Sequence, residues 1–199
     1  MSPLKFTQLI LHYLPSELGN LPNLTYLSLN GNNLTGEIPN SLGNLANIYY
    51  VVIEHNALYT HDSTLLTFLN NKGPGWTNSQ TIAPEDVTVS EVGTSSVLLQ
   101  WTPIAYTEDT GGYRIYYGTV PGGPSPGKPY GLFGTTDNKS ASQMEITGLE
   151  AETIYYFVIQ AWTDPNRGNK NTVYSDYSRE TSVNPFPWEL FYPVFIGKN

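Results

Sequence analysis

Four side chains in the first third of the chain, Glu54, His55, His61 and Asp62, are of types that could support chemistry. Imidazoles and carboxylates bind metal ions or exchange protons with a substrate, but only where they converge. Glu54 and His55 lie at the end of an expected strand, whereas His61 and Asp62 precede an expected helix. We therefore expect solvated polar residues and a helix N-cap, with no catalytic, cofactor-binding or metal-binding residues.

Two further runs approach ligand-binding patterns without completing them. The run GGPSPGK at 122–128 fits the phosphate-loop spacing, but Pro129 stands where a hydroxyl residue should bind magnesium, and prolines remove amide donors. The run DPNRGNKN at 164–171 begins like a calcium loop, but Ser175 stands in place of the bidentate glutamate. We predict a loop between strands for the first run and a hairpin between the last two strands for the second. An enzyme is not expected.

The N-terminal part of the chain repeats itself with a period of 24 residues. A shift by this period places Leu27 on Val51 and Asn32 on Asn56. Alternating apolar residues bury one side of a short strand, and the asparagine side chain can pair with backbone groups of neighbouring coils. Only two full coils and the end of a third are present, whereas about three repeats are normally needed for stability. We expect Met1 to lie inside what was once a longer array.

The run LTGEIPNSLGNL at 34–45 resembles the leucine-rich repeat family, in the subclass with a 24-residue period found in plant receptors and bacteria. This resemblance implies a truncated repeat region over 1–82, folded as a fragment of a right-handed β-α superhelical solenoid. Asp62 before TLLTFLNN predicts a helix at about 62–71, similar to the terminal cap of bacterial leucine-rich repeat proteins. A linker, TNSQTI, follows.

From Ala83 onward the pattern changes to short alternating strands separated by turn residues, which is typical of a β-sandwich. Trp101, the run YRIYY and the spacing LxxxTxY that ends at Tyr155 resemble a fibronectin type III domain. The last motif is similar to the tyrosine corner, in which a phenol oxygen bonds to the preceding loop. Glu152 stands where the family often has glycine. The resemblance implies an immunoglobulin-like sandwich over 83–184, and the whole fold is expected to be mainly β.

Composition narrows the function classes. The chain of 199 residues has no cysteine, a net charge of -8 and a pI near 4.7. Disulfides and thiolate sites are excluded, and an acidic chain is a poor partner for nucleic acid or anionic membranes. No run is long and apolar enough for a transmembrane segment, and the N-terminus lacks the pattern of a signal peptide. The aromatic tail at 185–199 predicts packing on the rest of the chain, a partner surface or a sorting signal.

The outward positions of the repeat strands are the expected binding surface. Stacked coils would place Tyr26 beside Tyr50 and Asn30 beside Glu54 on the concave side, where leucine-rich repeat proteins usually bind peptides, proteins or glycans. Tyrosine offers a large contact area and a polar tip at low entropic cost. The full set comprises Tyr26, Ser28, Asn30, Tyr49, Tyr50, Val52, Glu54 and His55.

These observations predict a non-catalytic interaction module of a secreted or cell-surface bacterial protein, which binds protein, peptide or glycan through the repeats and uses the sandwich as a spacer. One alternative is an accessory piece that targets an extracellular carbohydrate-active enzyme to its substrate. Another is a truncated gene fragment without independent function.

Overall fold

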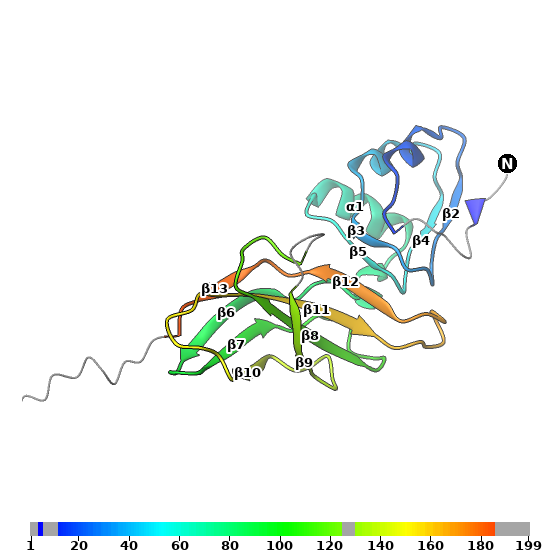
Figure 1. Ribbon diagram of the computed structural model, residues 1–199. Helices are drawn as coiled ribbons and strands as arrows, with labels where there is room; N and C mark the ends of the chain where they lie inside the picture. The colour runs from blue at the N-terminus through cyan, green and yellow to red at the C-terminus, as the bar shows by residue number, and fades with distance from the viewer. Residues whose placement is uncertain (1–3, 6–11, 125–129, 186–199) are drawn as a thin grey trace, which may run out of the picture.

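The computed structural model describes residues 4–5, 12–124 and 130–185. They form two units with separate hydrophobic clusters: the N-terminal unit, up to residue 81, and the sandwich, from residue 82. Figure 1 shows the N-terminal unit above one end of the sandwich. Most of the run that resembles a phosphate loop and nearly all of the aromatic tail lie outside the described residues.

The N-terminal unit is a stack of chain turns that run side by side. Strands β1, β2 and β4 form a parallel sheet, and β3 and β5 form a second parallel pair. Leu27 pairs with Val51, which confirms the 24-residue offset, whereas Gly36 pairs with Leu58, an offset of 22 residues. The five strands are β1 (Leu4–Lys5), β2 (Tyr26–Ser28), β3 (Thr35–Glu37), β4 (Tyr50–Val52) and β5 (Ala57–Tyr59).

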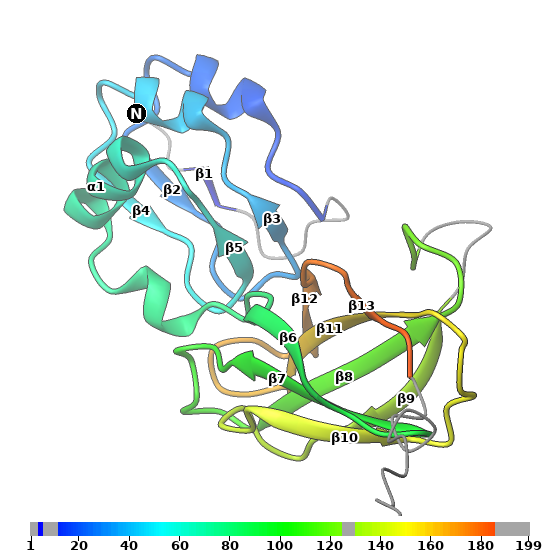
Figure 2. The ribbon, with the colours of Figure 1, turned by 90° about the vertical axis from the view of Figure 1, so that its left-hand side faces the viewer.

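Short helices connect the strands, and η1, η2 and α1 lie side by side (Figure 2). A helix is observed where the sequence predicts one, and Asp62 is its N-cap, because Asp62 Oδ1 accepts hydrogen bonds from the backbone N–H groups of Thr64 and Leu65 at 2.8 and 2.9 Å. These bonds satisfy donors that the first helical turn would otherwise leave unpaired. The role of this helix as the terminal cap of a repeat region stays a prediction. The helices are η1 (Ser16–Asn20), η2 (Asn40–Asn44), α1 (Ser63–Lys72) and η3 (Trp76–Ser79).

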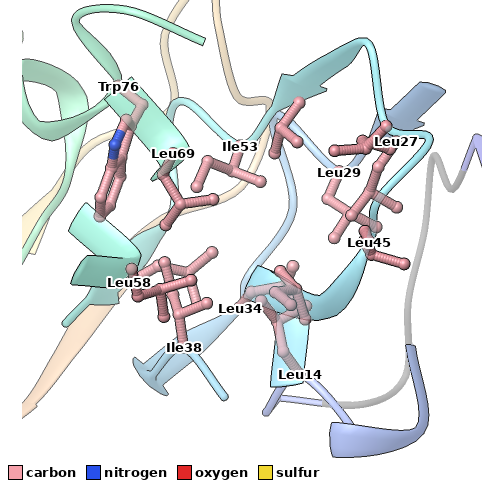
Figure 3. Packing of buried hydrophobic residues seen from close by; sticks show 14 of the residues in the cluster. Leu14, Leu27, Leu29, Leu34, Ile38, Leu45, Ile53, Leu58, Leu69 and Trp76 are labelled. Atoms are coloured by element: carbon pink, nitrogen blue, oxygen red, sulfur yellow. The ribbon is translucent and has the colours of Figure 1, made fainter. Parts of the chain in front are cut away.

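Aliphatic side chains from successive turns form one continuous core in this unit. Figure 3 shows Trp76 and Leu69 at one end of the cluster and Leu27 at the other. The described part holds two full turns and part of a third, too few to wind into a superhelix. The predicted solenoid is therefore not observed, and this unit is a short stack of turns.

The sandwich consists of two antiparallel sheets, in the orders β10-β7-β6 and β12-β11-β8-β9, with β13 also paired to β11. Its core is rich in aromatic residues, and the rings of Trp101 and Tyr113 meet edge to face with centroids 5.3 Å apart. The strands are β6 (Glu85–Val92), β7 (Ser96–Thr102), β8 (Gly111–Gly118), β9 (Gly131–Thr135), β10 (Gln143–Thr147), β11 (Tyr155–Thr163), β12 (Val173–Tyr177) and β13 (Thr181–Val183).

Two local predictions for the sandwich are confirmed. The Tyr155 hydroxyl accepts a hydrogen bond from the backbone N–H of Glu150 at 3.0 Å, which is the tyrosine corner. Glu152 has φ 61°, a left-handed conformation that explains the glycine usual at this position. The run at 164–171 forms a hairpin as predicted, but it joins β11 to β12, and one further strand, β13, follows.

Candidate functional site

Side-chain amides hold the turns of the N-terminal unit together. The fully buried Asn56 accepts a hydrogen bond from Leu34 N–H at 3.2 Å and donates to the Leu29 carbonyl at 3.0 Å. One period later, Gln80 accepts from Leu58 N–H at 2.9 Å and donates to the Ile53 carbonyl, also at 2.9 Å. The same relation therefore recurs, and the run predicted as a linker belongs to the stack. Its signal is in the sequence, since Gln80 follows Asn56 by one period.

Strands β2 and β4 expose one side of their sheet, which we call the tyrosine face. Leu27 and Val51 point into the core, so the residues that alternate with them point outward. The rings of Tyr26 and Tyr50 stack with centroids 6.0 Å apart and 17° between their planes, and Tyr50 is 44% exposed. The tyrosine face consists of Tyr26, Ser28, Asn30, Tyr50, Val52 and Glu54.

The polar end of this face combines an amide with a carboxylate. Ser28 Oγ donates to Asn30 Oδ1 at 3.0 Å. Among the described residues, no hydrogen bond reaches the buried Oε2 of Glu54. A buried acceptor without a donor is costly, so this oxygen is an unsatisfied group at the edge of the face.

Two of the expected surface residues lie elsewhere. Tyr49 precedes β4 and is 85% exposed beside the tyrosine face, outside the alternation of the strand. His55 has φ 56° and turns toward the sandwich, where its Nδ1 lies 3.3 Å from the Tyr106 hydroxyl. This left-handed turn ends the strand pattern, so His55 is part of the junction between the units.

The hairpin between β11 and β12 docks on the turns that follow β2 and β4. The buried Asn169 donates from Nδ2 to the carbonyls of Asn32 and His55 at 2.6 and 3.0 Å. The backbones of Gly31 and Gly168 approach so closely that a Cβ on Gly31 would lie 2.5 Å from the Gly168 oxygen. Nothing in the hairpin sequence indicated this role, because the partners of Asn169 lie more than a hundred residues away.

A buried lysine continues the junction inside the sandwich. Lys139 is 3% exposed, and its Nζ lies 3.8 Å from the centroid of the Tyr106 ring and donates to Thr163 Oγ1 at 3.2 Å. An ammonium group only donates, so the Thr163 hydroxyl is free to donate to Thr81 Oγ1, 2.7 Å away. Burial lowers the pKa of Lys139 to about 8, against the attraction of two nearby carboxylates.

The histidine and carboxylate side chains that could have supported chemistry have other roles in the fold. Asp62 caps α1, and His61 Nδ1 lies 3.4 Å from a carboxylate oxygen of Glu37 at the surface. In the described ranges, no group of three or more histidine, aspartate or glutamate side chains is placed to hold a metal ion. The arrangement offers an exposed aromatic surface and a hydrogen-bonded junction between the two units.

Comparison with known proteins identifies the second unit. Residues 82–176 match the fibronectin type III domain, a general interaction or spacer module that is typically non-catalytic. No curated protein matches the chain. No helix in the described part of the chain is long and apolar enough to cross a membrane.

Solved structures with a similar fold cover about half of the chain. One is titled "Myokine structure" (19% identity, 54% of this chain and 99% of that chain, TM-score 0.41). Another contains the FN1–FN3 domains of chicken CNTN1 (18% identity, 53% and 32% covered, TM-score 0.41). A third is a computer-based redesign of a β-sandwich protein (19% identity, 52% and 94% covered, TM-score 0.37).

Proposed function

We propose that the chain, with its fibronectin type III domain at residues 82–176, is a non-catalytic interaction module that binds a protein, peptide or glycan on the tyrosine face. In this proposal 1–82 is a truncated leucine-rich repeat region, 83–184 is the spacer and 185–199 is a separate tail. The parallel pairing at a 24-residue offset and the recurring amide bonds support kinship of the first region with leucine-rich repeats.

The stacked pair of Tyr26 and Tyr50 carries the proposal. Two parallel rings at the surface of a rigid sheet lose little conformational entropy on binding, and a sugar ring or apolar side chain can pack on them. The Asn30 amide and the Glu54 carboxylate lie four residues further along the chain, just after the ends of the two strands, and would give a bound ligand its orientation. Fibronectin type III domains are common in extracellular proteins, which supports a secreted or surface location.

Arrays of peptides and of glycans, screened with the full chain, test this function. Hits are then measured by titration calorimetry with Tyr50→Ala, for which we expect about tenfold weaker binding because a central aromatic contact is lost. Tyr174→Ala, an exposed tyrosine on β12, is the matched control and should bind like the parent chain. Equal affinity of the parent and Tyr50→Ala would refute the role of the tyrosine face.

A further inference from the structure

A cleft of about 680 Å³ lies between the N-terminal unit and the sandwich, on residues that the tyrosine face does not use. It is lined by the end of β5, by α1 and η3, by the start of β6 and by the end of β12. Figure 2 shows the start of β6 and strand β12 close to the end of β5. The volume suits a short peptide segment, and the hydrogen bonds across the junction keep the walls in place before a ligand arrives.

Carboxylates outnumber basic groups on the walls, and two of them are held in position. Thr102 Oγ1 donates to Asp86 Oδ2 at 3.0 Å, and Thr35 Oγ1 donates to Asp176 Oδ1 at 3.1 Å. The other oxygen of each carboxylate has no hydrogen bond within the described residues, and neither carboxylate forms an ion pair there. The charged side chains of the sandwich part of the cleft are Glu85, Asp86, Asp176 and Arg179.

The ring of Tyr59 lies in the same negative field. Burial raises the pKa of the Tyr59 phenol, and the carboxylates of Asp176 and Glu37 raise it further. A potential that keeps a phenol protonated also attracts a cation, and the face of the ring adds a cation–π contact. This wall of the cleft therefore favours an ammonium or guanidinium group.

The floor of the cleft is apolar and contains an unused donor. Leu66, Ile82 and Pro84 line it beside Trp76, whose buried indole N–H has no partner among the described residues. Apolar surface accommodates the methylene stem of a lysine or arginine side chain. Because this indole N–H is buried, it takes no part in the contacts proposed below.

One wall is a free strand edge. Strand β6 is the outer strand of its sheet, and its ladder with β7 passes from Glu85 directly to Thr88. Asp86 and Val87 form a bulge, with Asp86 in the left-handed region at φ 52°. A bulge twists the strand edge and hinders pairing with an added strand, so the side chains of this edge, led by Asp86, are what it offers a ligand.

We propose that this cleft binds an extended peptide segment that carries a lysine or arginine side chain, with the cation at the carboxylates of Asp86 and Asp176 and at the ring of Tyr59. The side-chain stem lies on the apolar floor.

Two blocked peptides that differ only in a central lysine or norleucine test the proposal by NMR titration of the full chain. We expect the lysine peptide to shift amide signals of β5, β6 and β12 and the norleucine peptide to bind much more weakly, with the difference reduced at high salt. Asp86→Asn and Asp176→Asn should each weaken the lysine peptide about fivefold. Equal binding of both peptides would overturn the proposal, as would a neutral oligosaccharide that occupies the cleft more tightly.

Controls separate this site from a general effect of charge and from the tyrosine face. Glu145→Gln removes an exposed carboxylate from β10, at the opposite edge of the same sheet, and should leave the affinity unchanged. Tyr50→Ala should also leave it unchanged, so failure of the tyrosine face and failure of the cleft give different results. If Glu145→Gln weakens the peptide as much as Asp86→Asn, the carboxylates act only through net charge and the cleft proposal is wrong.

Discussion

The core of the N-terminal unit is almost entirely leucine, isoleucine and valine, with Trp76 at one end, whereas the core of the sandwich contains five aromatic side chains among its buried residues. The aliphatic core comes from turns that contact their neighbours in sequence. The aromatic core comes from strands of two sheets that face each other. A stack of turns has two open ends, so it depends on whatever covers them, while the sandwich buries the inner faces of its two sheets against each other.

The two units also differ in how they satisfy their buried backbone groups. In the N-terminal unit, the side chains of Asn56 and Gln80 satisfy backbone groups of the preceding turn. In the sandwich, long strand ladders satisfy most backbone groups, and single hydroxyls such as that of Tyr113 bridge the loops. Stability of the first unit therefore rests on a few side chains, and stability of the second is distributed over its ladders.

The largest expected effect comes from Asn56→Ala. Its removal leaves the buried N–H of Leu34 without a partner and weakens the pairing of the Leu29 carbonyl, which we expect to cost about 3 kcal/mol. Peptide-resolved hydrogen exchange should show faster exchange throughout the N-terminal unit and much less change in the sandwich. Asn33→Ala, an exposed residue in a neighbouring turn, is the control with near-parent exchange. Uniform acceleration in both units would show that they unfold as one.

The second-largest effect is expected from Asn169→Ala, which weakens the junction between the two units. Two hydrogen bonds to the carbonyls of Asn32 and His55 are lost, and we expect about 2 kcal/mol less stability, felt in both units. Hydrogen exchange should increase in the turns after β2 and β4 as well as in the hairpin. Arg167→Ala, exposed in the same hairpin, should change neither. A change confined to the hairpin would contradict the docking described here.

A smaller effect, restricted to the sandwich, is expected from Tyr155→Phe. The ring remains in the core and only the hydrogen bond from Glu150 N–H is lost, at a cost of about 1 kcal/mol. Urea denaturation should show a lower midpoint with an unchanged slope, and Tyr156→Phe, at a half-buried position, should differ little from the parent. Loss of stability in the N-terminal unit would show that the corner acts beyond its own domain.

The pH dependence of stability reports on the buried lysine without the loss of any contact. Burial lowers the pKa of Lys139 to about 8 in the folded chain, below its value of 10.5 when unfolded. Between these values the unfolded state binds the extra proton, so stability should rise as the pH increases from about 8 toward 10. Above about 10 the buried tyrosines, whose pKa values are raised, reverse the trend. Thermal melts of Lys139→Met should lack the rise, and an unchanged profile would show that another group causes it.

Features of the fold that depend on local motifs or on the 24-residue period were predicted correctly. Leu27 and Val51 paired as the repeat required, Asp62 capped its helix and Tyr155 formed the corner, because each depends on partners close in sequence or one period away. The repeat count also indicated that the stack would be short. The solenoid was predicted by resemblance and is not observed, since so few turns cannot define a superhelix.

Contacts between the units could not be predicted in this way. His55 was placed on the open surface, but a left-handed backbone turns it toward Tyr106, and no local pattern encodes that change. Asn169, Lys139 and Asp176 act through partners from the other unit or from distant strands. The role of Gln80 could have been predicted, because Gln80 follows Asn56 by one 24-residue period and differs from it only in being glutamine and not asparagine.

The hairpin between β11 and β12 holds the turns after two successive strands through their backbone carbonyls and a close approach of two glycines. The sandwich is thus attached to the flank of the stack. Turns added on the β1 side would leave every one of these contacts intact. An engineered chain could therefore lengthen the tyrosine face by whole periods while the position of the sandwich stays constant.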